Sequence, residues 1–171
     1  MPHRLSIRAA RVEDVDFMHA LLAPFAEKEI VLARDKDNIC QHLQEFLVAE
    51  YDGKLAGVVA VHIYSTILAE IRSLVVAPKY QRHGLGALMV EACEKWVGEL
   101  GVTQIFALTY VTVFFEKQGY KVVSKESLPH KIWTVCVHCS RFSHCDEVAV
   151  LKKLGKDAQA HTAPIIEISQ G

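Results

Sequence analysis

The sequence lacks the features that mark several large classes of protein. None of its apolar runs, such as residues 55–61, approaches the roughly 18 residues needed to cross a bilayer. The opening Met-Pro-His-Arg has no apolar core of the kind found in a signal peptide. We therefore expect a cytoplasmic protein without a membrane partner.

A surplus of charge of either sign is also absent. The 19 Lys and Arg residues are balanced by 20 Asp and Glu, for a formal net charge of −1. Proteins that bind nucleic acid usually carry a basic excess, so we expect no nucleic-acid partner. The five cysteines are an odd number in a chain without a signal peptide, which favours free thiols or a metal site over a disulfide framework.

Internal repeats and low-complexity segments are missing as well, and no Gly/Ser linker precedes about the last fifteen residues. With 51% hydrophobic residues, the chain has the composition of one soluble globular domain. We assign this domain to residues 1–154 and treat residues 155–171 as a C-terminal tail, in which residues 164–168 have the pattern of an edge strand.

Apolar periodicity predicts an α/β domain. The Asp52-Gly53 pair favours a tight turn with positive φ, so the segments on either side of it form a hairpin. Strands are predicted at residues 5–8, 46–51, 55–61, 69–76, 104–110 and 120–123. Helices are predicted from residue 15 with an interruption near Pro24, around residues 39–46, from 85 to 100, and at 113–117.

A glycine-bearing loop, Gln81-Arg82-His83-Gly84-Leu85-Gly86-Ala87, lies between a predicted strand and the long helix. At a helix start several backbone N–H groups lack partners, and glycine lets a large anion approach them closely. The loop can therefore hold a pyrophosphate. It is not a P-loop, because Gly-Lys-Ser/Thr is missing, and it lacks the third glycine of the dinucleotide fingerprint. From spacing alone, a plain turn without a ligand stays open.

The pattern Gln81-x-x-Gly84-x-Gly86 resembles the acetyl-CoA loop of the GNAT acetyltransferase superfamily, Gln/Arg-x-x-Gly-x-Gly/Ala. Two further stretches resemble the same family in the same order: the strand at residues 70–78, and the segment Phe-Phe-Glu-Lys-Gln-Gly-Tyr at 114–120. The resemblance implies a mixed central sheet of about six or seven strands with a V-shaped splay, flanked by about four helices. It also implies acetyl-CoA as cosubstrate, with no metal. The cofactor-binding residues that it implies are Leu74, Val75, Val76, Gln81, Arg82, His83, Gly84, Leu85, Gly86, Ala87 and Leu88.

Within the superfamily, residues 30–34, 46–53 and 128–133 are similar to the acetyltransferase domain of the N-acetylglutamate synthases. This likeness implies transfer of acetyl to the α-amino group of L-glutamate, by direct attack in a ternary complex, at the opening of arginine biosynthesis. Longer synthases carry an amino-acid-kinase domain for which this chain has no room, so it resembles a short single-domain form. A homodimer is left open.

The reaction needs a proton acceptor, because an α-ammonium group is mostly protonated at neutral pH. The resemblance assigns this role to Glu70, whose alternative is an exposed strand carboxylate. The family's general acid is a Tyr in the helix where this chain has Phe114-Phe115. Tyr110 is the nearest replacement, with a wall of the site as its alternative.

Binding a dicarboxylic acceptor requires cations that make directed hydrogen bonds. Arg34, Arg72 and Lys131 are the candidates, and Arg72 shares a strand face with Glu70 because the two are two residues apart. Taken singly, each is also explained as a surface charge.

Three cysteines and two histidines between residues 136 and 145 raise the alternatives of a zinc site, a reversible thiol pair, or ordinary packing. For function, two readings compete with glutamate acetylation: a GNAT enzyme with another amino acid, amine or protein terminus as acceptor, and a non-catalytic acetyl-CoA-binding module.

Overall fold

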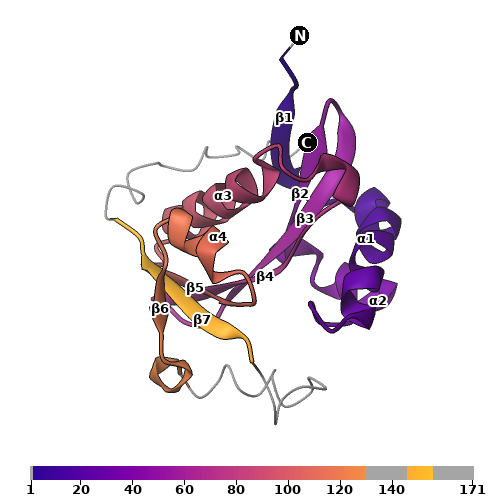
Figure 1. Ribbon diagram of the computed structural model, residues 1–171. Coiled ribbons are helices and arrows are strands. Elements are labelled where there is room, and N and C mark those ends of the chain that lie inside the picture. Colours follow the sequence, from indigo (N-terminus) through magenta and orange to yellow (C-terminus); the bar gives the residue numbers. More distant parts are fainter. Residues whose placement is uncertain (1, 130–145, 156–171) are drawn as a thin grey trace, which may run out of the picture.

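A seven-stranded mixed sheet forms the centre of the computed structural model, which describes residues 2–129 and 146–155 (Figure 1). The strands are β1 (Leu5–Ala9), β2 (Phe46–Tyr51), β3 (Lys54–Ile63), β4 (Leu68–Val76), β5 (Gln104–Thr109), β6 (Lys121–Val123) and β7 (Val148–Lys153). Their order in the sheet is β1-β2-β3-β4-β5-β7-β6, and β4 and β5 form the parallel pair in this otherwise antiparallel sheet.

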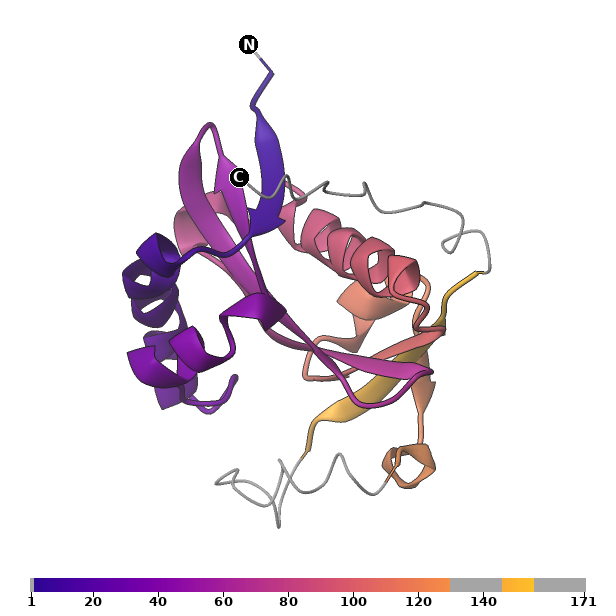
Figure 2. The ribbon, with the colours of Figure 1, turned by 180° about the vertical axis from the view of Figure 1, so that it is seen from behind.

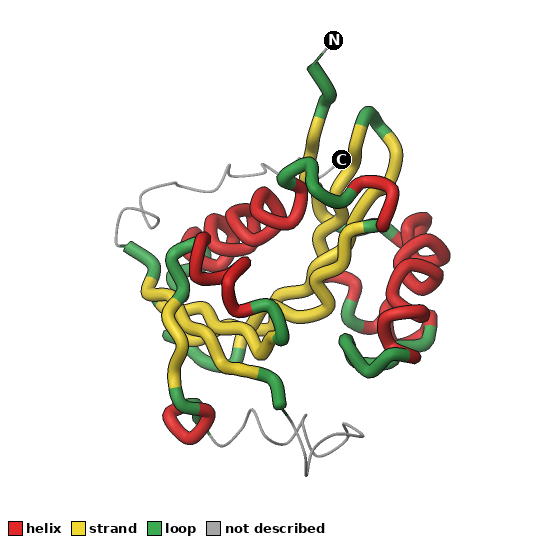
Figure 3. The backbone as a smooth tube through the Cα atoms, in the orientation of Figure 1, coloured by secondary structure: helices red, strands yellow, loops and turns green. Residues whose placement is uncertain are grey.

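Helices cover both faces of the sheet (Figures 2 and 3). Their bounds are α1 (Val15–Glu27), α2 (Lys36–Gln41), α3 (Leu85–Glu99) and α4 (Thr112–Lys117). Short 3₁₀ turns lie at Val12–Asp14, Leu43–Glu45, Pro78–Tyr80 and Lys125–Ser127. The predicted mixed α/β architecture of the GNAT type is thus confirmed. None of the helices in the described part of the chain is long and apolar enough to pass through a membrane.

Each helical layer buries its own apolar stripe. Met89 and Cys93 of α3 are fully buried in one core, together with residues of β3 and β5. On the opposite face, Met18 and Leu22 of α1 pack over Val58 of β3 in a second core. The sheet is therefore enclosed from both sides in its central part.

The predicted interruption near Pro24 is wrong, because α1 runs through this residue to Glu27. Proline removes one N–H donor and leaves the carbonyl of the residue four positions earlier without its helical partner. Here Pro24 and Ala20 are both exposed, so water can satisfy that carbonyl. The predicted hairpin is confirmed: Asp52 and Gly53 both have positive φ, 50° and 78°.

A β-bulge interrupts β4 at Ser73. Val58 of β3 pairs with Val75, and the next paired residue, Ala60, faces Arg72, so two residues of β4 oppose one of β3. Ser73 has a left-handed backbone, with φ 51°. The extra residue shifts the side-chain alternation beyond it.

The parallel strands β4 and β5 separate beyond this bulge. Their pairing ends at Ile71 and Ala107, whereas β4 continues to Val76 with β3 as its partner. The edge of β4 that faces β5 therefore has no strand paired with it over residues 73–76. This geometry is the V-shaped splay that the resemblance to the GNAT superfamily implied.

Candidate active site

The loop at residues 81–84 leads into α3 through two left-handed residues, Arg82 with φ 66° and Gly84 with φ 81°. The first intrahelical hydrogen bond runs from the Leu88 N–H to the Gly84 carbonyl, at 3.1 Å. The N–H groups of residues 85–87 therefore have no helical acceptor, and no side chain in the described residues caps the helix. Together with the helix dipole, these groups favour a bound anion.

Two side chains of the loop, those of Gln81 and His83, attach it to the rest of the domain. Gln81 donates from Nε2 to the Val76 carbonyl, at 3.0 Å, and so ties the loop to the end of β4. The His83 ring lies 5.2 Å from the ring of Tyr51, which in turn lies 5.1 Å from that of Tyr80. These predicted cofactor residues thus serve at least to hold the loop in shape.

Gly86 lies against the first turns of α4. A Cβ at this position would lie 3.3 Å from Cζ of Phe114. A larger side chain here would therefore obstruct the space between α4 and the N–H groups at the start of α3. The side chain of Leu85 is buried in the core, which leaves its backbone N–H for a ligand. The residues present therefore fit a pyrophosphate held by backbone groups.

The side chains at the end of β4 are structural. Val75 is buried in the core under α1, whereas Leu74 and Val76 pack toward α3 because of the bulge at Ser73. What β4 offers to an extended ligand in the splay is therefore its backbone edge.

Glu70 lies in the part of β4 before the bulge and is buried, with 7% of its surface exposed. Its Oε2 accepts hydrogen bonds from the Tyr64 hydroxyl, at 2.8 Å, and from Nε of Arg72, at 2.7 Å. The exposed strand carboxylate that we had considered for Glu70 is therefore ruled out.

Arg72 is also mostly buried and is committed to its neighbours. Nη2 donates to the Tyr64 hydroxyl, and Nε donates to Glu70. Burial alone would lower the pKa of Arg72, but the charge of Glu70 and the hydrogen bonds outweigh this effect and raise it. A guanidinium has five N–H donors, so three remain after these two bonds.

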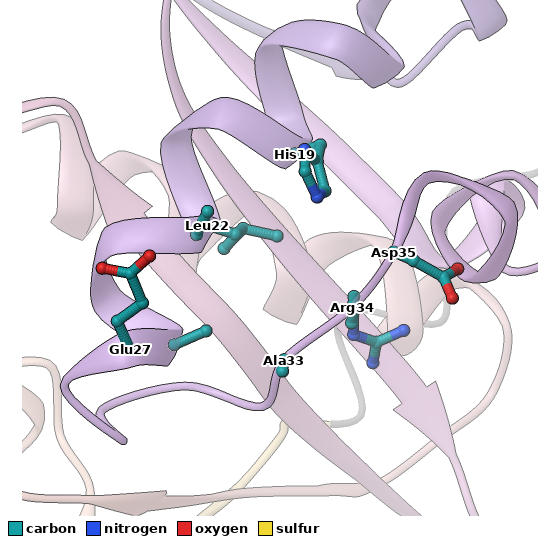
Figure 4. Close-up of a pocket in the computed structure, with 8 residues that line it drawn as sticks. His19, Leu22, Glu27, Ala33, Arg34 and Asp35 are labelled. Atoms are coloured by element: carbon teal, nitrogen blue, oxygen red, sulfur yellow. The ribbon is translucent and has the colours of Figure 1, made fainter.

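Arg34 comes from the segment between α1 and α2 (Figure 4). Nη1 donates to Oδ1 of Asn38, at 3.1 Å, while Nε is buried without a hydrogen-bond partner in the described residues. Burial lowers the pKa of Arg34, and the positive charge of Arg72 lowers it further, against the opposing effect of Glu45 and Glu70. Arg34 therefore lies within electrostatic range of Arg72, Glu45 and Glu70.

Arg34 also lines a cavity of about 510 Å³ between α1 and the segment that follows it. The other lining residues are His19, Leu22, Ala23, Ala26, Glu27, Ala33 and Asp35. Arg34 therefore belongs both to this cavity and to what we call the acceptor cluster, namely Arg34, Tyr64, Glu70 and Arg72.

Tyr110 lies beyond the part of β5 that pairs with β4, which ends at Ala107. It directly follows β5 and is 40% exposed. The strand partner of Glu70 is Phe106, and four residues of strand separate Phe106 from Tyr110 by about 13 Å. The role of Tyr110 as general acid stays a prediction.

Several predicted sites lie outside the described residues. They include Lys131, the cysteines and histidines between 136 and 145, and the edge strand at 164–168. Within residues 2–129 and 146–155, no group of three or more His, Cys, Asp or Glu side chains is arranged to hold a metal ion.

Comparison with known proteins decides the family. The model of the acetyltransferase (GNAT) family matches residues 15–120, which is more than half of the chain. The chain belongs to the GNAT acetyltransferase family. An uncharacterized N-acetyltransferase of Chlorobaculum tepidum is 39% identical over 148 residues, covering 86% of this chain and 96% of the relative.

Two named relatives are amino-acid acetyltransferases. The amino-acid acetyltransferase of Mycobacterium tuberculosis is 33% identical over 117 residues, which cover 67% of each chain. That of Neisseria meningitidis serogroup B is 33% identical over 128 residues, 73% of this chain and 29% of the relative. The chain thus spans less than a third of the Neisseria enzyme.

Two solved structures have a fold similar to that of this chain. The N-acetylglutamate synthase of Neisseria gonorrhoeae, complexed with coenzyme A and N-acetyl-glutamate, superposes with a TM-score of 0.81 at 26% identity, over 89% of this chain and 35% of that one. A Mycobacterium tuberculosis protein in complex with CoA gives 0.78 at 25% identity, over 88% and 99%. The GNAT protein described here is therefore an acetyl-CoA-dependent N-acetyltransferase.

One member of the acceptor cluster was not predicted. Tyr64 carries no motif, and it follows a strand that reads as an ordinary apolar run. The register of the β3–β4 hairpin would have indicated it. In that register His62 pairs with Glu70, and Tyr64 lies two residues beyond His62, on the same side of the strand.

Proposed function

We propose that this GNAT enzyme transfers the acetyl group of acetyl-CoA to the α-amino group of L-glutamate, in the cytoplasm and as part of arginine biosynthesis. The amino-acid acetyltransferases and the N-acetylglutamate synthase among its relatives support this acceptor class. The observation that carries the proposal is the pair of partly buried guanidinium groups, Arg34 and Arg72, beside a buried carboxylate.

In this proposal Glu70 takes a proton from the acceptor ammonium, directly or through water, so that a neutral amine reacts. The backbone at the start of α3 and the free edge of β4 would hold the pyrophosphate and the extended arm of acetyl-CoA, which supplies the acetyl group. The burial of Glu70 strengthens its interaction with a cationic amine because the local dielectric is low.

The carboxylates of the acceptor would be bound by the cations. Nε of Arg34 is a buried donor without a partner in the described residues, and a buried donor gains most from a charged acceptor. Three N–H groups of Arg72 remain available after its bonds to Glu70 and Tyr64. Lys131 stays a predicted third cation.

The proposal is tested by measuring CoA release with glutamate, glutamine, other amino acids and simple alkylamines. Losing one charge-assisted hydrogen bond costs about 1.5–3 kcal/mol, so glutamate should exceed glutamine roughly tenfold to a hundredfold in kcat/KM. Arg34→Leu and Lys131→Leu form a matched pair: the variant that removes the cation facing the γ-carboxylate should narrow this gap, while the other should weaken both acceptors alike.

Faster turnover of glutamine or an alkylamine than of glutamate would refute the glutamate assignment. The enzyme would then be a GNAT acetyltransferase with another acceptor, which is the alternative that the sequence left open.

A further inference from the structure

Tyr64 is held in one orientation by contacts around its ring. The residue follows β3 directly, and its backbone N–H donates to the Leu68 carbonyl, at 2.9 Å. The ring lies 4.7 Å from that of His62 and 6.0 Å from that of Phe106, and the guanidinium carbon of Arg72 lies 5.4 Å from its centroid. A side chain packed in this way loses little further freedom when its hydroxyl makes a hydrogen bond.

The Tyr64 hydroxyl closes a triangle of hydrogen bonds with Glu70 and Arg72. It donates to Oε2 of Glu70 and accepts from Nη2 of Arg72, while Nε of Arg72 donates to the same Oε2. Burial, followed by the negative charge of Glu70, raises the pKa of Tyr64 above its usual value near 10. The phenol thus stays a neutral donor across the working pH range.

The two oxygens of Glu70 differ in their surroundings. Oε2 receives both donors, whereas Oε1 accepts no hydrogen bond from the described residues. The Glu70 side chain keeps 9% of its surface exposed. Among the described residues, one carboxylate oxygen is thus anchored by two donors and the other is engaged by none.

We propose that Tyr64 is a positioning residue: its hydroxyl and Arg72 fix Oε2 of Glu70, and so direct Oε1 toward the amine that is to lose its proton. This inference rests on the proposed role of Glu70 as proton acceptor. Tyr64 itself acts through Glu70 and transfers no proton to the acceptor.

The test is a double-mutant cycle of Tyr64→Phe and Glu70→Gln, measured as CoA release at saturating acetyl-CoA with the best acceptor of the panel. Tyr64→Phe keeps the ring packing and removes only the hydroxyl, so we expect a loss of about tenfold in kcat with the KM for acetyl-CoA unchanged. In the Glu70→Gln background the same substitution should change kcat less than about twofold, because the group through which it acts is gone.

A second readout is the dependence of kcat on pH. If Tyr64 acts through Glu70, the shape of this profile should differ between Tyr64→Phe and the wild type, whereas a loss of packing alone would lower kcat by the same factor at every pH. The other charged or titratable groups near Glu70 are Arg72 on its own strand, Arg34 ahead of α2, and the pair formed by Glu45 and His62, joined at 2.9 Å. All of these are unchanged in the variant.

Tyr120→Phe is the matched control, since it removes a hydroxyl from a buried tyrosine that packs on Phe115, away from both the acceptor cluster and the loop at residues 81–88, and its kcat should equal that of the wild type. Equal losses from Tyr64→Phe in the two backgrounds, or wild-type kcat in Tyr64→Phe, would overturn the inference. If glutamate were a poor acceptor but another amine reacted, the glutamate assignment would fail, and the same cycle run with that amine would still decide the role of Tyr64.

Discussion

The two ends of the active site are built in different ways. The proposed cofactor end consists mainly of backbone from one continuous stretch, residues 81–88, shaped by two left-handed residues. The acceptor cluster consists of side chains from three separate segments: Arg34 ahead of α2, Tyr64 after β3, and Glu70 with Arg72 on β4. A ligand common to a whole family can be held by a local motif, whereas acceptor choice depends on side chains that only the folded sheet assembles.

The sharpest test of this division is Glu70→Gln. The amide keeps the shape but cannot accept the proton, so kcat should fall at least about a hundredfold while the affinity for acetyl-CoA stays the same. The loss should shrink at high pH, where more of the acceptor is already neutral. Glu91→Gln, at an exposed position of α3, is the control. Equal rates for Glu70→Gln and wild type near neutral pH would remove Glu70 from the mechanism.

The converse test is Gly86→Glu, which acts at the cofactor end. Its side chain would meet Phe114 and bring a negative charge to the anion site, so calorimetry should show a loss of acetyl-CoA affinity of about a hundredfold. Gly155→Glu makes the same change where no atom lies within 4 Å of the added Cβ, and it should bind normally. An unchanged affinity in Gly86→Glu would refute the assignment of the loop.

A smaller effect, confined to the acceptor, is expected for Arg34→Leu. Removing this guanidinium should lower kcat/KM for glutamate about tenfold to a hundredfold, mainly through KM, because the cation binds ground state and transition state alike. Acetyl-CoA affinity, measured by calorimetry, should be that of the wild type. A matching loss of acetyl-CoA affinity would show that the two ends of the site are not independent.

Asp14→Asn should leave both ends intact and lower only stability. Asp14 is buried and accepts from Nη1 and Nη2 of Arg8, at 2.7 and 2.9 Å, and from the Arg11 N–H, at 2.8 Å. Because Arg8 is partly exposed, we expect a loss of about 1–2 kcal/mol in the free energy of unfolding by urea titration, with normal kcat.

The pH dependence of this loss follows from the charge of Asp14. The hydrogen bonds from Arg8, more than the opposing effect of burial, lower the pKa of Asp14 in the folded state. Its contribution is therefore complete above the unfolded-state pKa near 4 and disappears as the pH falls through the folded-state value. The difference between wild type and Asp14→Asn should accordingly narrow below about pH 4, and a constant difference would contradict this account.

Local signals account for the parts of the molecule that the sequence predicted well. The Asp52-Gly53 turn fixes a hairpin that spans residues 46–63, and the apolar spacing from Leu85 onward defines α3 within its own length. The glycine-bearing turn before α3 was predictable for the same reason, since Gly84 and the start of the helix are neighbours in the sequence.

Features that depend on distant pairing were missed. Strand β7 forms only by insertion between β5 and β6, and its short run at residues 148–153 carries no turn motif that would mark it. The place of Tyr64 beside Glu70 follows from the β3–β4 register. Arg72 was predicted as a substrate cation, and no pattern indicated that Glu70 and Tyr64 already engage it.

The bulge at Ser73 divides β4 into two parts whose side chains alternate in opposite phase. In a regular strand Glu70, Arg72, Leu74 and Val76 would all point to one face. With one extra residue, Glu70 and Arg72 keep the face of the acceptor cluster, while Leu74 and Val76 turn to the face of α3. A single extra residue therefore sets how Glu70, the proposed proton acceptor, is oriented relative to the loop that follows β4. A design that grafts residues 81–88 onto another sheet must therefore keep the extra residue in the preceding strand. Removing one residue from β4 would turn Glu70 to the other face of the sheet relative to the loop.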